Sequence, residues 1–271
     1  MTKLTIIDGN NWAWRGLEVG RSVRQLFEDV RRVALESPVF LVWDHPNGSQ
    51  PRRDLFPEYK KGRKPMSEDR SANFEYLKGV LLLAPITSFQ VPNVEADDVI
   101  AYLANAWDGP VHIRTTDVDL SAIPGATTER VNELPCPQEY IRVYKTLVGD
   151  SSDNIKGLPG FGVKGFNDLD SVQLDAIIAA LETGKAGTVR DTLMEIVPSK
   201  LKNTILKVDV AENLLTYWKI IGFMPIDPHS TSEHITYGTD QYQAACDIFA
   251  RFFDDSADRP SIDPGVGLAA I

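Results

Sequence analysis

The sequence predicts an α/β protein built on a mainly parallel, doubly wound sheet. Short apolar runs alternate in the first half of the chain with stretches that repeat apolar residues at helical spacing, and the second half is mostly helical in pattern. Strands that alternate with helices form parallel sheets, because each return to the sheet needs a crossover connection. The 271 residues suffice for one large domain with a smaller appendage.

Each expected element follows from its own pattern. The expected strands are the apolar runs Leu4–Ile7, Val39–Trp43, Ser88–Val91 and Val111–Thr115. Helical spacing predicts helices over Val23–Leu35, Phe74–Leu83, Glu95–Ala106, Glu139–Leu147, Leu174–Leu181, Thr188–Ile196 and Ala211–Ile221. The polar stretch Asp8–Asn11 predicts a loop after the first strand. We therefore expect a sheet core over 1–137, a mostly helical part over 138–255 and a loose Pro- and Gly-containing tail over 256–271.

The composition excludes several classes of protein. Hydrophobic residues make up 43% and charged residues 24%, which is ordinary for a globular chain, and no run of about 20 apolar residues could span a bilayer. The N-terminus enters a strand-like run directly without a signal peptide, so we expect a cytoplasmic protein. Cys136 and Cys246 are too few for a disulfide framework or a zinc site.

Charge is distributed unevenly along the chain. The net charge of −10 argues against a generally basic nucleic-acid binder. The segment 52–64 nevertheless carries six basic residues against two acidic ones. The basic residues are Arg52, Arg53, Lys60, Lys61, Arg63 and Lys64.

Acidic residues gather where the expected strands end. Asp8, Asp44 and Asp117 each follow a strand, at the edge of the sheet where ligands of such folds bind. Taken singly, acids at turns and helix starts are ordinary, because they cap the helix and complement its dipole. Taken together, nine carboxylates are candidates for one crevice: Asp8, Asp44, Glu95, Asp97, Asp98, Asp117, Asp119, Asp150 and Asp153.

Carboxylates held this close together repel one another and need cations to neutralise them. Oxygen ligands without a His or Cys partner favour Mg²⁺ or Mn²⁺ over zinc. Two such ions about 3.5–4 Å apart stabilise both the attacking and the leaving oxygen when a phosphodiester is cleaved. The acids therefore predict metal-dependent phosphoryl chemistry with two ions in the active site.

Six sequence blocks occur in an order that resembles the flap endonuclease/5′→3′ exonuclease family. The blocks are Ile7–Asn11, Val42–Asp44, Phe56–Arg63, Val94–Asp98, Thr116–Leu120 and Val148–Lys164. That family includes the 5′-nuclease domain of bacterial DNA polymerase I and stand-alone bacteriophage enzymes. The resemblance covers residues 4–225 and implies a PIN-like nuclease core over 1–137, with a basic arch or clamp at 52–80 and a helix–hairpin–helix variant in the region 138–255.

The resemblance also implies ligands for the two metal ions. One set, for the more tightly held ion, is Asp8, Asp44, Glu95, Asp97 and Asp98. The other set, which acts partly through water, is Asp117, Asp119, Asp150 and Asp153. The product would be a DNA fragment with a 5′-phosphate.

Three residues of the basic segment are candidates for catalytic contact with the substrate. Arg63 can grip a phosphate with two N–H groups, and Lys60 can reach the scissile phosphate as a mobile point charge. Tyr59 and Arg63 would share one face if the segment were helical, and Tyr59 could then stack on an unpaired base. Lys64–Ala72 is short and interrupted by Pro65, which argues against a closed helical arch.

A glycine-rich stretch is the candidate for contact with duplex DNA. Gly157, Gly160 and Gly162 would let backbone N–H groups approach phosphate at the start of a helix, with Lys164 as a further contact. Family members also bind a monovalent cation here, which implies K⁺. The basic residues Arg52, Arg53, Lys61 and Lys64 complete the expected DNA-binding set.

These observations favour a divalent-metal-dependent, structure-selective 5′-nuclease. We expect Mg²⁺, with Mn²⁺ able to substitute, and DNA with 5′ ends, nicks, gaps or flaps bound without sequence specificity. We expect the protein to be a monomer that works with a replicative polymerase or a single-strand-binding protein. If the chain is viral, we expect it in the host cytoplasm. Two alternatives remain open at this point: a PIN-type RNA endonuclease and a catalytically silent binder of DNA junctions.

Overall fold

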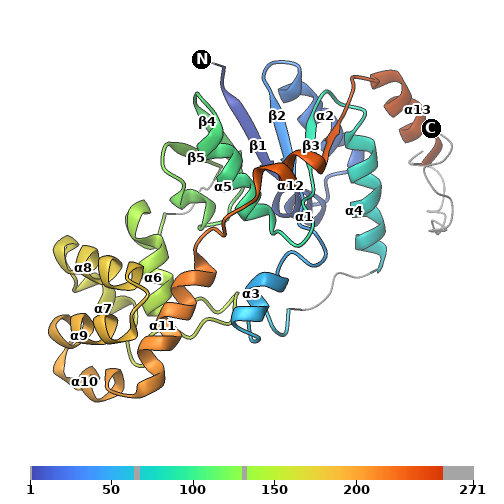
Figure 1. Cartoon of the computed structure of the whole chain (residues 1–271). Coiled ribbons are helices and arrows are strands. Elements are labelled where there is room, and N and C mark those ends of the chain that lie inside the picture. The colour runs from blue at the N-terminus through green and yellow to red at the C-terminus, as the bar shows by residue number, and fades with distance from the viewer. Residues whose placement is uncertain (1, 64–67, 130–132, 253–271) are drawn as a thin grey trace.

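The computed structural model describes residues 2–63, 68–129 and 133–252 (Figure 1). The predicted DNA contact Lys64 and the predicted tail 256–271 lie outside the described residues. Among the described residues, no helix is both long enough and apolar enough to span a membrane.

One mixed, mostly parallel sheet forms the centre of the molecule. Its strands are β1 (Leu4–Asp8), β2 (Val39–Val42), β3 (Thr87–Phe89), β4 (Val111–Arg114), β5 (Ala126–Thr128) and β6 (Ile235–Tyr237). The order across the sheet is β5-β4-β1-β2-β3-β6. Every pair is parallel except β3 and β6, which run antiparallel. The predicted α/β class with a mainly parallel sheet is confirmed.

Helices cover both faces of this sheet. One face is covered by α1 (Gly9–Glu18), α2 (Val23–Ala34), α4 (Glu68–Leu81) and α13 (Tyr242–Phe252). The other face packs against α5 (Ala96–Ala106). Successive residues of a strand point to opposite faces, so Ile6 joins the cluster around α5 while Ile7 joins the cluster around α2. The sheet therefore has two apolar cores, one on each side.

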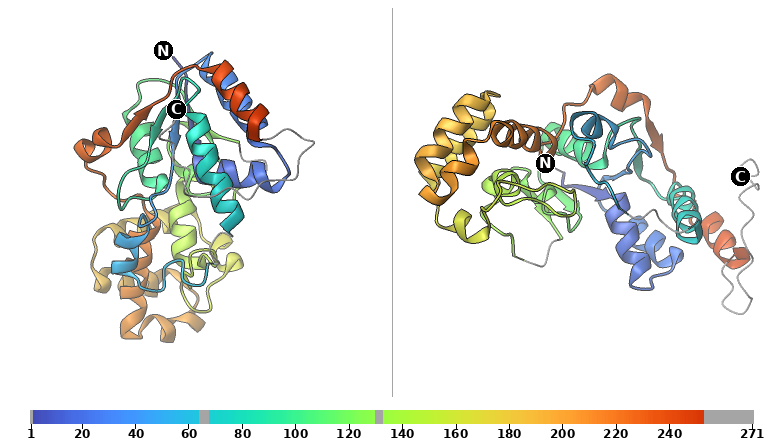
Figure 2. Two further views of the ribbon diagram at one scale, coloured as in Figure 1. Left: turned by 90° about the vertical axis from the view of Figure 1, so that its right-hand side faces the viewer. Right: turned by 90° about the horizontal axis from the view of Figure 1, so that it is seen from below.

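A group of helices beside the sheet has an apolar core of its own (Figures 1 and 2). It consists of α6 (Ile141–Val148), α7 (Val163–Asn167), α8 (Ser171–Glu182), α9 (Ala186–Ile196), α10 (Ser199–Ile205) and α11 (Val208–Ile221). Leu147, Ile177, Leu193 and Ile205 are fully buried within it. This core also includes Tyr59 from the basic segment, and the division of the chain at residue 138 stays a prediction.

The remaining elements are short. They are α3 (Gln50–Leu55), α12 (Pro228–Glu233) and the 3₁₀ turns η1 (Leu120–Ala122) and η2 (Gln138–Tyr140). Figure 1 shows α3, which begins the basic segment, below the sheet and beside α11.

Two local expectations from the sequence were wrong. The expected loop at Asp8–Asn11 is the start of α1, because Asp8 caps this helix by accepting a hydrogen bond from the N–H of Asn11 at 3.2 Å. The stretch Phe56–Arg63 forms turns instead of a helix, and Lys60 within it has a positive φ of 54°. Tyr59 and Arg63 therefore do not share a helical face.

A glycine-rich turn joins α6 to α7. Asp150 and Ile155 form an isolated antiparallel bridge inside this connection. Gly157 has a φ of +67°, and a Cβ atom there would lie 2.5 Å from the carbonyl oxygen of Leu147. Only glycine fits this position without displacing the backbone of α6. The turn therefore holds the end of α6 and the loop that follows it in one fixed arrangement.

Candidate active site

An open cleft of about 830 Å³ lies at the carboxyl edge of the parallel strands. Asp8 ends β1, Asp44 follows β2 and Asp117 follows β4, and all three line this cleft. They meet because parallel neighbours β2, β1 and β4 end at the same edge. Seven of the nine predicted carboxylates line it: Asp8, Asp44, Asp97, Asp117, Asp119, Asp150 and Asp153.

The carboxylate at the end of β1 lies in a strongly unfavourable place for a negative charge. Asp8 is 5% exposed and accepts hydrogen bonds from the hydroxyl of Thr115 at 2.8 Å and from the N–H of Asn11. Burial, and then the charges of Asp44 and Asp117, raise the pKa of Asp8 to about 7. The hydrogen bonds from Thr115 and Asn11 lower the pKa by less than burial and the neighbouring charges raise it.

Other carboxylates of the cleft share this property. Burial, followed by the charges of Asp117 and Asp8, raises the pKa of Asp97 well above its ordinary value. Burial also raises the pKa of Asp44, although its Oδ1 accepts a hydrogen bond from the N–H of Ala96 at 2.8 Å. The cleft therefore concentrates more negative charge than its own cations neutralise. Its oxygen donors fit hard divalent cations, which would remove this excess.

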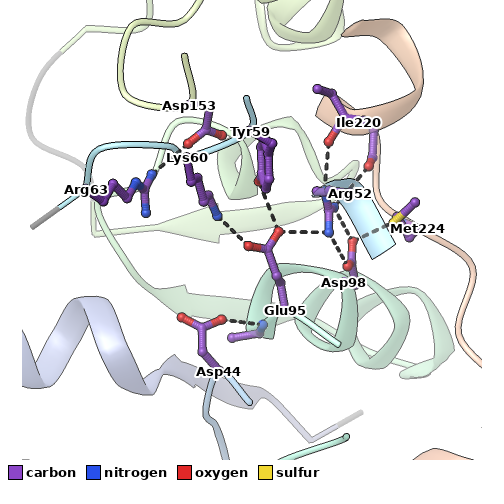
Figure 3. Close-up of polar contacts among 12 residues, drawn as sticks. Asp44, Arg52, Tyr59, Lys60, Arg63, Glu95, Asp98, Asp153, Ile220 and Met224 are labelled. Carbon is purple, nitrogen blue, oxygen red and sulfur yellow. Dashed lines mark hydrogen bonds and ion pairs between the residues drawn. The ribbon is translucent and has the colours of Figure 1, made fainter. Parts of the chain in front are cut away.

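Glu95 differs from these residues because donors surround it (Figure 3). Its Oε1 accepts from Nζ of Lys60 at 2.6 Å, and its Oε2 accepts from the hydroxyl of Tyr59 at 3.0 Å. Oε2 also forms an ion pair with Nη1 of Arg52 at 2.8 Å. Burial alone would raise the pKa of Glu95, but Lys60 and Arg52 outweigh burial and hold the pKa below its ordinary value. Glu95 is thus a fixed anion that holds the basic segment against α5.

Asp98 faces away from the cleft. Asp97 lines the cleft and Asp98 does not, which agrees with the angle of about 100° between neighbouring residues of a helix. Asp98 is 2% exposed and is gripped by both terminal nitrogens of Arg52 at 2.7 Å. It also accepts a hydrogen bond from the N–H of Met224 at 2.8 Å. This position disagrees with the predicted role of Asp98 as a metal ligand.

The ion pair with Asp98 holds Arg52 away from the surface where the sequence predicted DNA binding. Arg52 is 3% exposed, and it also donates to the carbonyl oxygens of Ile220 at 2.8 Å and Gly222 at 3.2 Å (Figure 3). The sequence suggested a phosphate contact because Arg52 belongs to a basic run. Its side chain borders the cleft but is buried, and it joins α3, α5 and the end of α11.

The basic turn packs on the loop that carries the last two carboxylates. Nη2 of Arg63 donates to Asp153 at 2.6 Å, and the backbone N–H of Lys60 donates to the carbonyl oxygen of Asp153 at 3.2 Å. Lys60 and Arg63 both line the cleft. Tyr59 also lines it, but only 3% of Tyr59 is exposed and its hydroxyl is bound to Glu95. The expected stacking of Tyr59 on a base does not agree with this position.

A second group of carboxylates lies across the cleft. Oxygen atoms of Asp119, Asp150 and Asp153 all lie within 4.8 Å of one another. Sequence reasoning missed their basic neighbour, Lys145, whose Nζ lies 2.6 Å from Asp119 and 2.8 Å from Asp150. Its position five residues before Asp150, in the last turn of a helix, was the available signal. Burial raises the pKa of Asp119 to about 6 in spite of Lys145.

Of the other predicted DNA contacts that the structure describes, Gly157 is buried in the turn after α6 and the rest are exposed. Arg53 and Lys61 lie on the surface of the basic segment, where Lys61 pairs with Glu58 at 2.7 Å. Gly160 has a φ of +81°, Gly162 is the N-cap of α7, and Lys164 is exposed in that helix. Whether these residues bind DNA stays a prediction.

Convergent carboxylates at the strand ends of an α/β sheet, with a lysine and an arginine at their edge, define a metal-dependent enzyme of phosphoryl transfer. Residues 3–147 match the family described as 5′-3′ exonuclease, N-terminal resolvase-like domain. The chain belongs to this 5′-3′ exonuclease family, a family of nucleases.

Relatives agree with this assignment, and a solved structure has a similar fold. The chain is 31% identical over 195 residues to flap endonuclease Xni of Shewanella frigidimarina, which covers 62% of this chain and 76% of the relative. It is 30% identical over 192 residues to DNA polymerase I of Pseudomonas aeruginosa, but these span 59% of this chain and only 21% of that much longer protein. The crystal structure of the T5 D15 protein with metal ions matches 92% of this chain and 97% of its own with a TM-score of 0.60, at 22% identity.

Proposed function

We propose that this protein is a divalent-metal-dependent, structure-selective 5′-nuclease that hydrolyses phosphodiester bonds in DNA and leaves 5′-phosphate ends. The observation that carries the proposal is the gathering of seven carboxylates in one open cleft, with Lys60 and Arg63 at its edge. The similarity to flap endonuclease Xni and to part of a DNA polymerase I supports DNA as the substrate.

The carboxylates of the cleft would hold two divalent ions. Asp8, Asp44 and Asp97 would hold one ion, and the remaining residues Asp117, Asp119, Asp150 and Asp153 would hold the other. Mg²⁺ is the proposed ion and Mn²⁺ its substitute, because all donors are hard oxygens. When bound, the ions supply charge that stabilises the developing phosphate charge and activates the attacking water.

The chain's own residues would position the phosphate. An ammonium group has three N–H donors, so Lys60 can keep its bond to Glu95 and donate to a phosphate oxygen as well. Arg63 donates to Asp153 and to the carbonyl oxygen of Ser152, and its guanidinium has further N–H groups for a phosphate. Both cations would then stabilise negative charge as the bond to the leaving oxygen breaks.

Exposed residues on either side of the cleft would hold the DNA without reading its sequence. Arg53 and Lys61 would contact phosphates near the cut, and Gly160, Gly162 and Lys164 would contact the duplex farther away. A K⁺ ion at the turn between α6 and α7, a monomeric state, a cytoplasmic location and cooperation with a polymerase or single-strand-binding protein are further parts of the proposal.

The experiment that tests the proposal compares three DNAs of one sequence: a 5′-flap, a nicked duplex and a blunt duplex. With Mg²⁺ we expect cleavage of the flap and the nicked duplex, 5′-phosphate products and no cleavage in EDTA. Asp117→Asn should lose at least about a hundredfold in rate, while Asp108→Asn, an exposed position outside the cleft, should cut normally. Preference for an RNA flap, or DNA binding without cleavage in both Mg²⁺ and Mn²⁺, would contradict the proposal.

A further inference from the structure

Lys145 occupies the middle of the second carboxylate group. Its Nζ lies 2.6 Å from Oδ1 of Asp119 and 2.8 Å from Oδ2 of Asp150, and only 14% of its side chain is exposed. The other oxygen of Asp150 accepts hydrogen bonds from the N–H of Ser152 at 2.9 Å and from its hydroxyl at 2.6 Å. One ammonium group therefore joins two carboxylates that the sequence assigns to a metal ion.

The backbone keeps this ammonium in place. Lys145 lies in the last turn of α6, between the fully buried residues Val143 and Leu147 of the helical core. The carbonyl oxygen of Lys145 accepts the hydrogen bond from Gly149 that ends the helix. Lys60 differs, since it lies in a turn with a positive φ on the edge of the cleft. The backbone of Lys145 is thus fixed beside the carboxylates, and the two ion pairs of the mostly buried side chain hold its charge near Asp119 and Asp150.

A divalent ion bound by Asp119, Asp150 and Asp153 would have this positive charge as a close neighbour. Oxygens of the three residues lie within 4.8 Å of one another. Two of the residues, Asp119 and Asp150, already contact Nζ of Lys145. Like charges a few ångströms apart repel strongly in a partly buried site. The ammonium also cancels part of the negative charge that would attract the ion. Both effects act against binding of a cation to this group.

We propose that Lys145 is a built-in counter-ion of the second carboxylate group, which holds Asp119 and Asp150 together without metal and weakens the binding of the second divalent ion. This inference rests on the proposed function, because that function requires two ions. Lys145 is a positioning residue here: it acts on the carboxylates and on the ion they hold. The two metal positions should therefore differ in affinity. Among the described residues, the lysine ion pairs of the cleft are with Glu95, Asp119 and Asp150, and none is with Asp8 or Asp97.

The test measures Mn²⁺ binding to the full chain without DNA, by calorimetry and by electron paramagnetic resonance of free Mn²⁺. Lys145→Met removes the charge and keeps most of the apolar stem, Lys145→Gln keeps N–H donors without the charge, and Lys145→Arg keeps the charge. The matched control is Lys156→Met, because Lys156 is exposed and contacts Asn154 instead of a carboxylate. All four variants are compared with the unmodified chain, which should bind two ions of unequal affinity.

We expect the weaker Mn²⁺ site to bind at least about tenfold more tightly in Lys145→Met and Lys145→Gln, and to change little in Lys145→Arg and in the control. Without metal, Lys145→Met should melt several degrees lower, and Mn²⁺ should raise its melting temperature more than that of the unmodified chain. If the Lys145→Met variant does not fold, the affinity is measured on the Lys145→Gln variant instead. An unchanged or weakened second site in the folded neutral variants would overturn the inference, whereas an unmodified chain that binds no Mn²⁺ would overturn the proposed function itself.

Discussion

Arg52 and Asp98 form a bidentate ion pair in the interior, with both nitrogen–oxygen distances at 2.7 Å. The side chains are only 4% and 2% exposed. Arg52 also binds Glu95 and two carbonyl oxygens at the end of α11. The helix that supplies Asp97 is therefore tied to the helical group through a single guanidinium.

We expect Arg52→Met to destabilise the protein by about 3–5 kcal/mol, because it leaves Asp98 as a buried charge without its cation. The double variant Arg52→Met/Asp98→Leu should recover a large part of this loss, since the uncompensated charge is then gone. Urea unfolding measures both values. Arg53→Met is the control, because Arg53 is exposed next to Arg52 and should change the free energy of unfolding by less than about 0.5 kcal/mol. A double variant no more stable than Arg52→Met would contradict this account.

Asp97 and Asp98 are adjacent in sequence but should differ in their effect on metal binding. Asp97→Asn removes a carboxylate of the cleft, so Mn²⁺ affinity should fall at least about tenfold with little loss of stability. Asp98→Asn removes the partner of Arg52, so the free energy of unfolding should fall by several kcal/mol while the folded fraction binds Mn²⁺ almost normally. Calorimetric titration at a temperature where both variants are folded distinguishes the two. Equal losses of affinity would show that Asp98 is a ligand after all.

The sequence was sufficient to predict four strands of the sheet and most of the cleft. It missed β5 and β6, which have three residues each and no continuous apolar run. Asp8, Asp44 and Asp117 were found because a buried apolar run precedes each of them, and parallel strands bring their ends to one edge. Membership in a family with these motifs then related Asp150 and Asp153, which no strand carries, to the same site.

The roles of Arg52, Tyr59 and Lys145 were not predictable in this way. Arg52 and Tyr59 depend on contacts with residues far apart in the chain, such as that between Arg52 and the carbonyl oxygen of Ile220. Lys145 is near Asp150 in sequence, but its contact with Asp119 depends on the fold. A basic run indicates positive charge, but it does not say which side chain turns inward. Tyr59 was expected on a helix, whereas the turn around Lys60 buries it against Glu95.

Stability without metal should depend on pH through Asp8. The pKa of Asp8 is about 7 in the folded protein against an ordinary value of 3.8, so the neutral form is favoured by folding. Asp8 therefore costs little stability near pH 4, costs progressively more as the pH rises to about 7, and costs a constant amount above that pH. Asp8→Asn removes this cost. In EDTA its stability relative to the unmodified chain should rise by about 2–4 kcal/mol between pH 4.5 and pH 8.

Urea unfolding at the two pH values in EDTA gives this difference, and any constant effect of the substitution cancels. Asp108→Asn should show no such change, because Asp108 is exposed and outside the cleft. Millimolar Mg²⁺ at pH 8 should stabilise the unmodified chain more than Asp8→Asn, since it binds the folded state through the charged carboxylates. A pH-independent difference between the two proteins would refute the unfavourable charge at Asp8.

Two glycines with the same backbone angle should respond differently to alanine. Gly157 has a φ of +67° and Gly184 a φ of +68°, so both pay the same conformational cost of about 1 kcal/mol for a Cβ atom. A Cβ atom at Gly184 meets nothing within 4 Å, whereas one at Gly157 would lie 2.5 Å from the carbonyl oxygen of Leu147 and 2.6 Å from the backbone nitrogen of Gly149.

Gly184→Ala should therefore lose about 1 kcal/mol of stability, and Gly157→Ala at least about 2 kcal/mol, because the end of α6 must move. That movement would also shift Lys145 and Asp150, which lie on either side of Gly149. Nuclease activity of folded Gly157→Ala should then fall while that of Gly184→Ala stays unchanged. Equal losses of stability in the two variants would mean that the backbone of the turn after α6 can move at little cost. The turn would then not hold the second carboxylate group in place.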